Sequence, residues 1–270
     1  TSLLDVAKAG LKRAQEAART LEEFSKVIAK PVEPDQTPLP EQLARIRYGL
    51  YTLEKAVLTA VGSNRRLEDR SLYLLLSVEI CQLDWKKVLR ESIAGGVGIV
   101  QVREKSMPDQ ELLAHLRRVR EITREADTLL IMNDRPDMAV LAGCDGVHVG
   151  QNELSVRDVR RIVGPGPLVG VSTHSIEQAR QAALDGASYL GIGPVFPSQT
   201  KQFHEFAGLD FVREVSREVS LPAFPIGGIG AANLGQVLEA GASRVAVSGE
   251  ICRADDPRVA AAGLAAKLAN

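Results

Sequence analysis

The chain has 270 residues, of which 45% are hydrophobic and 25% are charged, and its formal net charge is −1. This balance is typical of a globular protein with a buried core, and it gives no general attraction for nucleic acid or for an anionic membrane. No apolar run approaches the roughly 20 residues that span a bilayer. Three scattered cysteines (Cys81, Cys144 and Cys252) and no recognisable secretory signal lead us to expect a reduced, cytoplasmic setting.

The first 62 residues have the pattern of a helical hairpin. Apolar residues recur at steps of three and four from Leu4 to Ile28 and again from Leu43 to Val57, which predicts two amphipathic helices. Four prolines between residues 31 and 40 must interrupt the helix, and Gly62 is expected to end the second one. So small a hairpin buries little surface alone, so we expect it to pack on the larger domain or on a partner chain. A homo-oligomer is left open.

From about residue 70, short apolar runs alternate with helical stretches. Such alternation indicates parallel βα units, and eight of them close naturally into a barrel. We therefore expect an α/β fold, with residues 1–62 as a helical N-terminal domain, 63–69 as a linker and 70–270 as a (β/α)₈ TIM barrel. A doubly wound open sheet is the alternative. The expected strands are Leu72–Val78, Val97–Val102, Thr128–Met132, Gly146–Val149, Leu168–Val171, Tyr189–Ile192, Ala223–Ile226 and Arg244–Val247.

In either architecture ligands bind at the carboxyl ends of the strands, so the polar residues after each strand are the candidates for a site. After the second strand, alternation places Gln101, Arg103 and Lys105 on one side. Two cations and an amide there suit a polyanion such as pyrophosphate. The alternative is a solvated charge pair within the loop, such as Arg103 with Glu104.

The next three strand ends carry acids, a histidine and hydroxyls. Asp134, beside Asn133, and Glu153 could hold Mg²⁺ as an acidic pair, although an Asn-Asp pair also favours a plain turn. His148 is interpreted as a structural or substrate-packing residue. The hydroxyls at 172–173 could donate to phosphate oxygens, or they could cap the following helix, as Ser175 also could.

The loop after the sixth strand is the most informative segment. It contains two prolines, which stiffen it, and then Ser198, Thr200 and Lys201, which together predict a phosphate-gripping loop. After the last two strands come Gly227-Gly228 and Val247-Ser248, where barrels often hold a phosphate on backbone N–H groups. One strongly cationic and one neutral anion site are therefore expected. No arrangement for a protein nucleophile or for zinc emerges.

Six segments in order resemble the thiamine-phosphate synthase family over roughly residues 70 to 270. The resemblance implies a TIM-barrel transferase that uses Mg²⁺ to condense hydroxymethylpyrimidine pyrophosphate with thiazole phosphate, giving thiamine phosphate and pyrophosphate. The segments are Gln101–Lys105, Asn133-Asp134, Gly146–Gln151, Gly170–His174, Gly193–Lys201 and Ile226–Ile229.

The resemblance also implies residue roles. Asp134 and Glu153 should bind Mg²⁺, while Gly228, Val247 and Ser248 should hold the thiazole phosphate. Family members usually have aspartate at position 153 and threonine at position 198. The pyrimidine pyrophosphate should be held by Gln101, Arg103, Lys105, Asn133, Ser172, Ser198, Thr200 and Lys201, with Arg103, Lys105 and Lys201 acting on the leaving group.

The hairpin resembles a domain fused ahead of the synthase in some bacterial chains, on the strength of Leu4-Asp5 and Arg13–Glu23. Relatives of that domain are linked to phosphorylation of the pyrimidine monophosphate. The simpler interpretation is a solvated helix face with pairs such as Glu22–Lys26. Two rival functions for the whole chain are an isomerase like the thiazole tautomerases and a non-catalytic sensor of phosphate ligands.

Overall fold

A computed structural model describes residues 3–28, 36–197 and 206–269. The chain divides into two compact units, Thr1–Val61 and Gly62–Asn270. The first is a pair of helices and the second is an α/β barrel, and each is described by itself. Among the described residues, no helix is long and apolar enough to cross a membrane.

The larger unit is built around eight parallel strands, which confirms the predicted βα repeat. The strands are short and mostly apolar, as expected for strands that are covered on both faces. Each bound lies within two residues of the predicted one: β1 (Leu72–Leu76), β2 (Ile99–Val102), β3 (Leu129–Asn133), β4 (Gly146–Val149), β5 (Leu168–Thr173), β6 (Tyr189–Ile192), β7 (Ala223–Pro225) and β8 (Val245–Val247).

The strands pair in chain order, and β1 also pairs with β8, as in Leu74↔Val247. The last pair, β7 and β8, approach each other without ladder hydrogen bonds, so the barrel is nearly closed. The order never reverses around a switch point, which rules out the doubly wound sheet. The chain therefore has the TIM-barrel fold.

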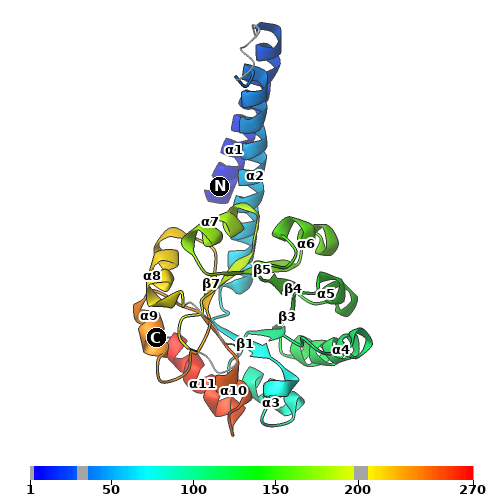
Figure 1. The fold of residues 1–270 in the computed structure, drawn as a ribbon, viewed down its shortest axis with the longest axis vertical. Coiled ribbons are helices and arrows are strands. Elements are labelled where there is room, and N and C mark those ends of the chain that lie inside the picture. The colour runs from blue at the N-terminus through cyan, green and yellow to red at the C-terminus, as the bar shows by residue number, and fades with distance from the viewer. Residues whose placement is uncertain (1–2, 29–35, 198–205, 270) are drawn as a thin grey trace. The chain divides into compact units, whose positions relative to one another are not determined.

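Helices surround the strands on the outside of the barrel (Figure 1). Several begin at a side-chain cap: Asp84, Ser155, Ser175 and Asp256 each accept from backbone N–H groups of the first turn. The helices are α3 (Trp85–Ala94), α4 (Asp109–Glu125), α5 (Pro136–Ala142), α6 (Val156–Val163), α7 (Ile176–Leu184), α8 (Gly208–Glu218), α9 (Leu234–Glu239), α10 (Gly249–Cys252) and α11 (Pro257–Leu268), with a 3-10 turn, η1 (Val78–Ile80).

The barrel interior is filled by side chains from most of the strands. Tyr73, Tyr189 and Phe224 pack edge to face, with ring centroids 5.2–5.9 Å apart. They belong to a buried cluster that also contains Ile131 and Leu67. Leu67 is fully buried although it comes from the helix that precedes the first strand.

That helix, α2 (Leu39–Leu67), corrects the prediction that Gly62 ends it and that residues 63–69 form a linker. A glycine inside a helix costs only about 1 kcal/mol relative to alanine. The five residues after Gly62 bring Leu67 into the barrel core, and Arg66 donates to the Gly166 carbonyl at 2.9 Å. Tertiary burial therefore outweighs the local preference for a helix end.

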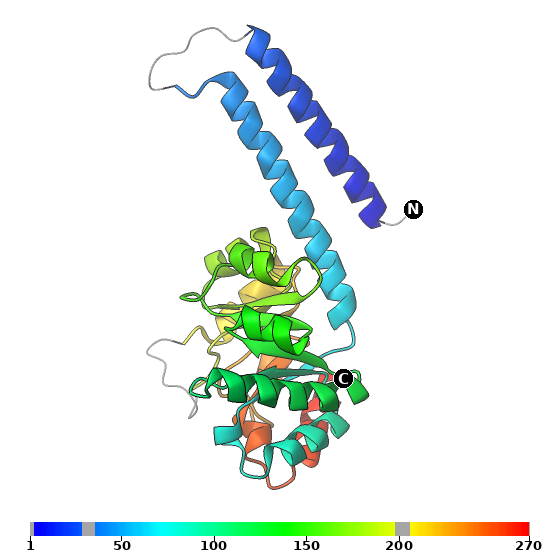
Figure 2. The same ribbon diagram turned by 90° about the vertical axis from the view of Figure 1, so that its right-hand side faces the viewer.

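In the smaller unit, α1 (Leu3–Ile28) runs antiparallel to α2 (Figure 2). The interface between the two helices is unexpectedly polar. Gln15 donates to Glu54 at 2.8 Å, and Arg47 donates to Glu22 at 2.7 Å. Glu22 is buried, and Lys26 lies 3.6 Å from it. The predicted Glu22–Lys26 pair is present, but the carboxylate is not on a solvated face.

Leu67→Ala tests the contribution of α2 to the barrel. Removing a fully buried leucine side chain from a packed cluster should lower the free energy of unfolding by about 2–5 kcal/mol, measured by urea denaturation. Leu141→Ala is the matched control, because Leu141 is 58% exposed on α5, and its effect should stay within about 0.5 kcal/mol. Equal effects of the two substitutions would contradict the assigned packing.

Candidate active site

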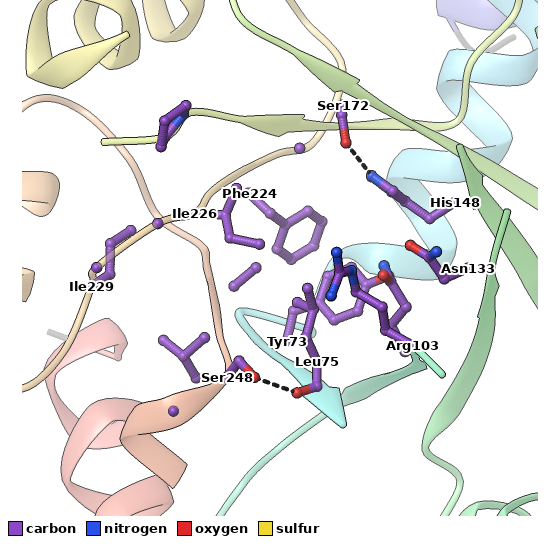
Figure 3. A pocket seen from close by; sticks show the side chains of 18 of the residues that line it. Tyr73, Leu75, Arg103, Asn133, His148, Ser172, Phe224, Ile226, Ile229 and Ser248 are labelled. Atoms are coloured by element: carbon purple, nitrogen blue, oxygen red, sulfur yellow. Dashed lines mark hydrogen bonds between the residues drawn. The ribbon is translucent and has the colours of Figure 1, made fainter. Parts of the chain in front are cut away.

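A cavity of about 1030 Å³ opens at the carboxyl ends of the strands. Figure 3 shows side chains from β1 to β8 converging on it. Ten predicted site residues line it: Gln101, Arg103, Lys105, Asn133, Asp134, Glu153, Ser172, Gly228, Val247 and Ser248. The remaining three, Ser198, Thr200 and Lys201, lie outside the described residues, so the predicted phosphate-gripping loop stays a prediction.

The cations after β2 face the cavity, and the alternative pairing of Arg103 with Glu104 does not hold. Glu104 turns away and accepts from the Val78 backbone N–H at 2.6 Å. Among the described residues, neither Arg103 nor Lys105 forms an ion pair. Both cations are therefore available to a ligand, as a polyanion site requires.

Asp134 and Glu153 line the same cavity from the ends of β3 and β4. Asp134 has a left-handed backbone, with φ of 61°, and accepts from Asn133 Nδ2 at 2.6 Å. Burial raises the pKa of Asp134, and the charge of Glu153 raises this pKa further, while Lys105 and Arg103 oppose the shift. The two carboxylates are thus close enough to repel each other.

The hydroxyls after β5 have three different fates. Ser172 lines the cavity and lies 2.9 Å from His148 Nε2. Thr173 is buried and donates to the Gly191 carbonyl, while Ser175 caps α7 by accepting from Gln178 N–H. Only Ser172 is therefore placed to meet a ligand.

The floor of the cavity carries a buried set of polar groups that the sequence analysis missed, apart from Gln101 and His148. Gln101 Nε2 donates to the Tyr73 hydroxyl at 2.7 Å, and the hydroxyls of Tyr73 and Tyr189 are 2.9 Å apart. His148 Nδ1 lies 3.2 Å from the Tyr189 hydroxyl. Burial lowers the pKa of His148 to about 4, so its ring is neutral near pH 7. The sequence feature that could have indicated this set is the presence of a tyrosine in each of two predicted barrel strands, at positions 73 and 189.

The loops after β7 and β8 form the neutral side of the cavity. Gly228 has φ of 62°, and an added Cβ would overlap the Pro197 carbonyl, so the close loop approach there requires glycine. Asn233 accepts from Gly230 N–H and donates to the Gly228 carbonyl, which holds the loop in shape. Ser248 Oγ donates to the Leu75 carbonyl at 2.9 Å (Figure 3). The Ser248 hydroxyl is therefore already used, and the loops would meet an anion mainly through backbone N–H groups.

Known proteins resemble both units. The family model described as thiamine monophosphate synthase matches residues 72–251, and that of the ThiD2 family matches residues 1–56. A thiamine phosphate pyrophosphorylase structure from Pyrococcus furiosus has a TM-score of 0.69 at 30% identity, covering 77% of this chain and 100% of that one. A 3-hexulose-6-phosphate synthase structure, at 20% identity and a TM-score of 0.56, shares the fold.

Two relatives named thiamine-phosphate synthase are each 40% identical to this chain. The one from Gloeobacter violaceus aligns with 95% of this chain and 72% of its own length. The one from Rhodopirellula baltica aligns with 97% of this chain and 70% of its own length. Identity at this level spans the barrel together with most of the N-terminal unit. The chain therefore belongs to the thiamine monophosphate synthase family.

Proposed function

We propose that the barrel cavity joins hydroxymethylpyrimidine pyrophosphate to thiazole phosphate, in keeping with the family's transferase activity, and that the predicted residues take the roles set out above. The observation that carries the proposal is that Arg103 and Lys105, which form no ion pair with any described residue, line the same cavity as the neutral loops after β7 and β8. This asymmetry matches one pyrophosphate leaving group, which carries more negative charge, and one monophosphate. Mixing both substrates with Mg²⁺ and detecting thiamine phosphate by mass spectrometry tests it.

The reaction is a displacement at the exocyclic methylene of the pyrimidine. The bond from this carbon to the pyrophosphate oxygen breaks, and the electron pair leaves with pyrophosphate. The thiazole nitrogen supplies the pair for the new carbon–nitrogen bond. Arg103 and Lys105 stabilise the growing negative charge on the leaving group, and we expect Lys201 to join them. The cavity holds the two rings in position, without a covalent intermediate on the protein.

The carboxylate pair fits Mg²⁺. Among the described residues no cluster of three or more metal-ligating side chains forms, but Mg²⁺ is commonly bound by one or two carboxylates together with waters and substrate phosphates. Burial and, after it, the charge of nearby Glu153 raise the pKa of Asp134, and a bound cation would oppose both effects. Asp134 and Glu153 would hold the ion, which when bound would neutralise pyrophosphate charge.

The rival functions are less favoured. A tautomerase-like isomerase handles no pyrophosphate and would leave Arg103 and Lys105 without a use, and the relatives are named as synthases. A sensor would bind both substrates without turnover, which the mass spectrometric assay detects. For the N-terminal unit we keep the structural role ahead of a pyrimidine-phosphate kinase.

Arg103→Gln tests the leaving-group role. The glutamine keeps a polar side chain but removes the charge, so kcat should fall by about 10²–10³, measured by pyrophosphate release. Arg90→Gln is the control, because the Arg90 side chain is 60% exposed on α3 and lies outside the cavity lining. Near-normal turnover of Arg103→Gln would remove this role.

Asp134→Asn tests the carboxylate pair through stability. Because the folded protein raises the pKa of Asp134, ionisation of this group costs stability. The cost is absent below the unfolded pKa of about 3.9 and fully present above the folded pKa. Without Mg²⁺, the variant should therefore melt at a higher temperature than the wild type near pH 7, and the difference should shrink toward pH 4.

Added Mg²⁺ should raise the Tm of the wild type and should have a smaller effect on Asp134→Asn. Asp210→Asn is the control, because its side chain is almost fully exposed on α8. An unchanged or lower Tm for Asp134→Asn at pH 7 would show that the ionised Asp134 does not destabilise the fold in the absence of Mg²⁺, which contradicts the proposed role of Asp134 and Glu153.

A further inference from the structure

Five side chains form a continuous hydrogen-bonded chain across the floor of the cavity. It runs from Gln101 through Tyr73, Tyr189 and His148 to Ser172, with neighbouring polar atoms 2.7–3.2 Å apart. Its two ends, Gln101 and Ser172, line the cavity and are among the residues assigned to the pyrimidine substrate. Figure 3 shows Ser172 and His148 pointing toward each other from adjacent strands.

Two glycines leave the space that the rings of this hydrogen-bonded chain occupy. An added Cβ at Gly170 would overlap the Tyr189 ring, and one at Gly191 would lie 3.1 Å from the His148 ring. Tyr73 and Tyr189 are almost fully buried. Each of these polar groups therefore depends on its partners in the chain for hydrogen bonding, because an unpaired buried group is costly.

The number of protons on each group means that all the hydrogen bonds of this hydrogen-bonded chain run in one direction, from donor to acceptor. The Tyr73 oxygen accepts from Gln101 Nε2, so its own proton is free for the Tyr189 oxygen. The Tyr189 proton then goes to His148 Nδ1, which leaves the neutral ring with its proton on Nε2. That N–H donates to Ser172 Oγ, so the Ser172 proton is available to a ligand.

The two ends consequently have opposite character. Among the described residues, the Gln101 carbonyl oxygen has no donor and can accept, while the Ser172 hydroxyl proton has no acceptor and can be donated. Rotating the Gln101 amide by 180° would invert every link and exchange the roles of the ends. One end therefore cannot change without the other, even though β2 and β5, which carry Gln101 and Ser172, are three positions apart in the sheet order.

We propose that Tyr73, Tyr189 and His148 are positioning residues that hold Gln101 and Ser172 as a matched acceptor and donor for the amine-bearing pyrimidine ring of the pyrophosphate substrate. A ring with an exocyclic amine and ring nitrogens offers the complementary donor and acceptor. The aromatic rings of Tyr73, Tyr189 and Phe224 below give a flat heteroaromatic ring an apolar surface. The inference rests on the proposed function and adds how the ring is selected.

Tyr73→Phe and Tyr189→Phe each break the chain while keeping the aromatic packing. Loss of one oriented hydrogen bond should raise KM for the pyrimidine pyrophosphate by about tenfold and leave KM for the thiazole phosphate within about twofold, with a smaller change in kcat. Discrimination against a pyrimidine pyrophosphate that lacks the exocyclic amine should also fall, because the acceptor end is no longer fixed. Tyr48→Phe is the control, since Tyr48 is 60% exposed in the N-terminal unit.

A double-mutant cycle between Tyr73→Phe and Ser172→Ala separates coupling from simple structural damage. The two side chains share no hydrogen bond among the described residues, so independent roles would give additive effects on the pyrimidine KM. The proposal expects the double variant to be little worse than the worse single variant. Additive effects, or equal rises in KM for both substrates, would overturn it.

Two measurements keep these outcomes interpretable. If Tyr73→Phe does not fold, as judged by its melting curve, Tyr189→Phe takes its place in the cycle. Wild-type turnover is measured first. Absence of thiamine phosphate would overturn the proposed function itself. Normal wild-type turnover with additive effects in the double-mutant cycle would overturn only the proposed coupling between Gln101 and Ser172.

Discussion

The geometric constraint on which the site depends is the near closure of eight parallel strands. Because the strands all run in one direction and pair in chain order, their carboxyl ends meet at a single mouth. Residues as distant in the chain as Arg103 and Ser248 therefore line one cavity. The interior below the mouth is filled by aromatic rings and by Leu67, so the cavity has a solid floor and a substrate cannot pass through the barrel.

Charge is distributed unevenly around that mouth, and the proposed places of the two substrates follow from this unevenness. Arg103 and Lys105 stand on one side beside two mutually repelling carboxylates, and the other side offers glycine-rich backbone. A leaving group with several charges is stabilised on the first side, where cations act in a partly buried space, while a monophosphate needs only N–H donors. The overall net charge of −1 does not reveal this local field.

In our proposal, the neutral network on the cavity floor adds selectivity to this electrostatic binding. Cations can hold a pyrophosphate whatever ring it carries, because Coulomb attraction has little directional preference. Discrimination between rings needs oriented donors and acceptors, and these keep their orientation only when their partners are fixed. The hydrogen-bonded chain from Gln101 to Ser172 places such partners at the floor of the cavity, on five different strands.

The sequence by itself determined the repeat of eight strands, the barrel and ten of the residues that line its cavity, because hydrophobic periodicity and strand-end position are local properties of the chain. Only the tertiary structure decided where α2 ends, since burial of Leu67 outweighs the local preference of Gly62. It alone decided that the Ser248 hydroxyl donates to the Leu75 carbonyl and that the hydroxyls of Tyr73 and Tyr189 form a hydrogen bond. These outcomes depend on contacts between residues more than 100 positions apart in the chain, or on packing that no local pattern encodes.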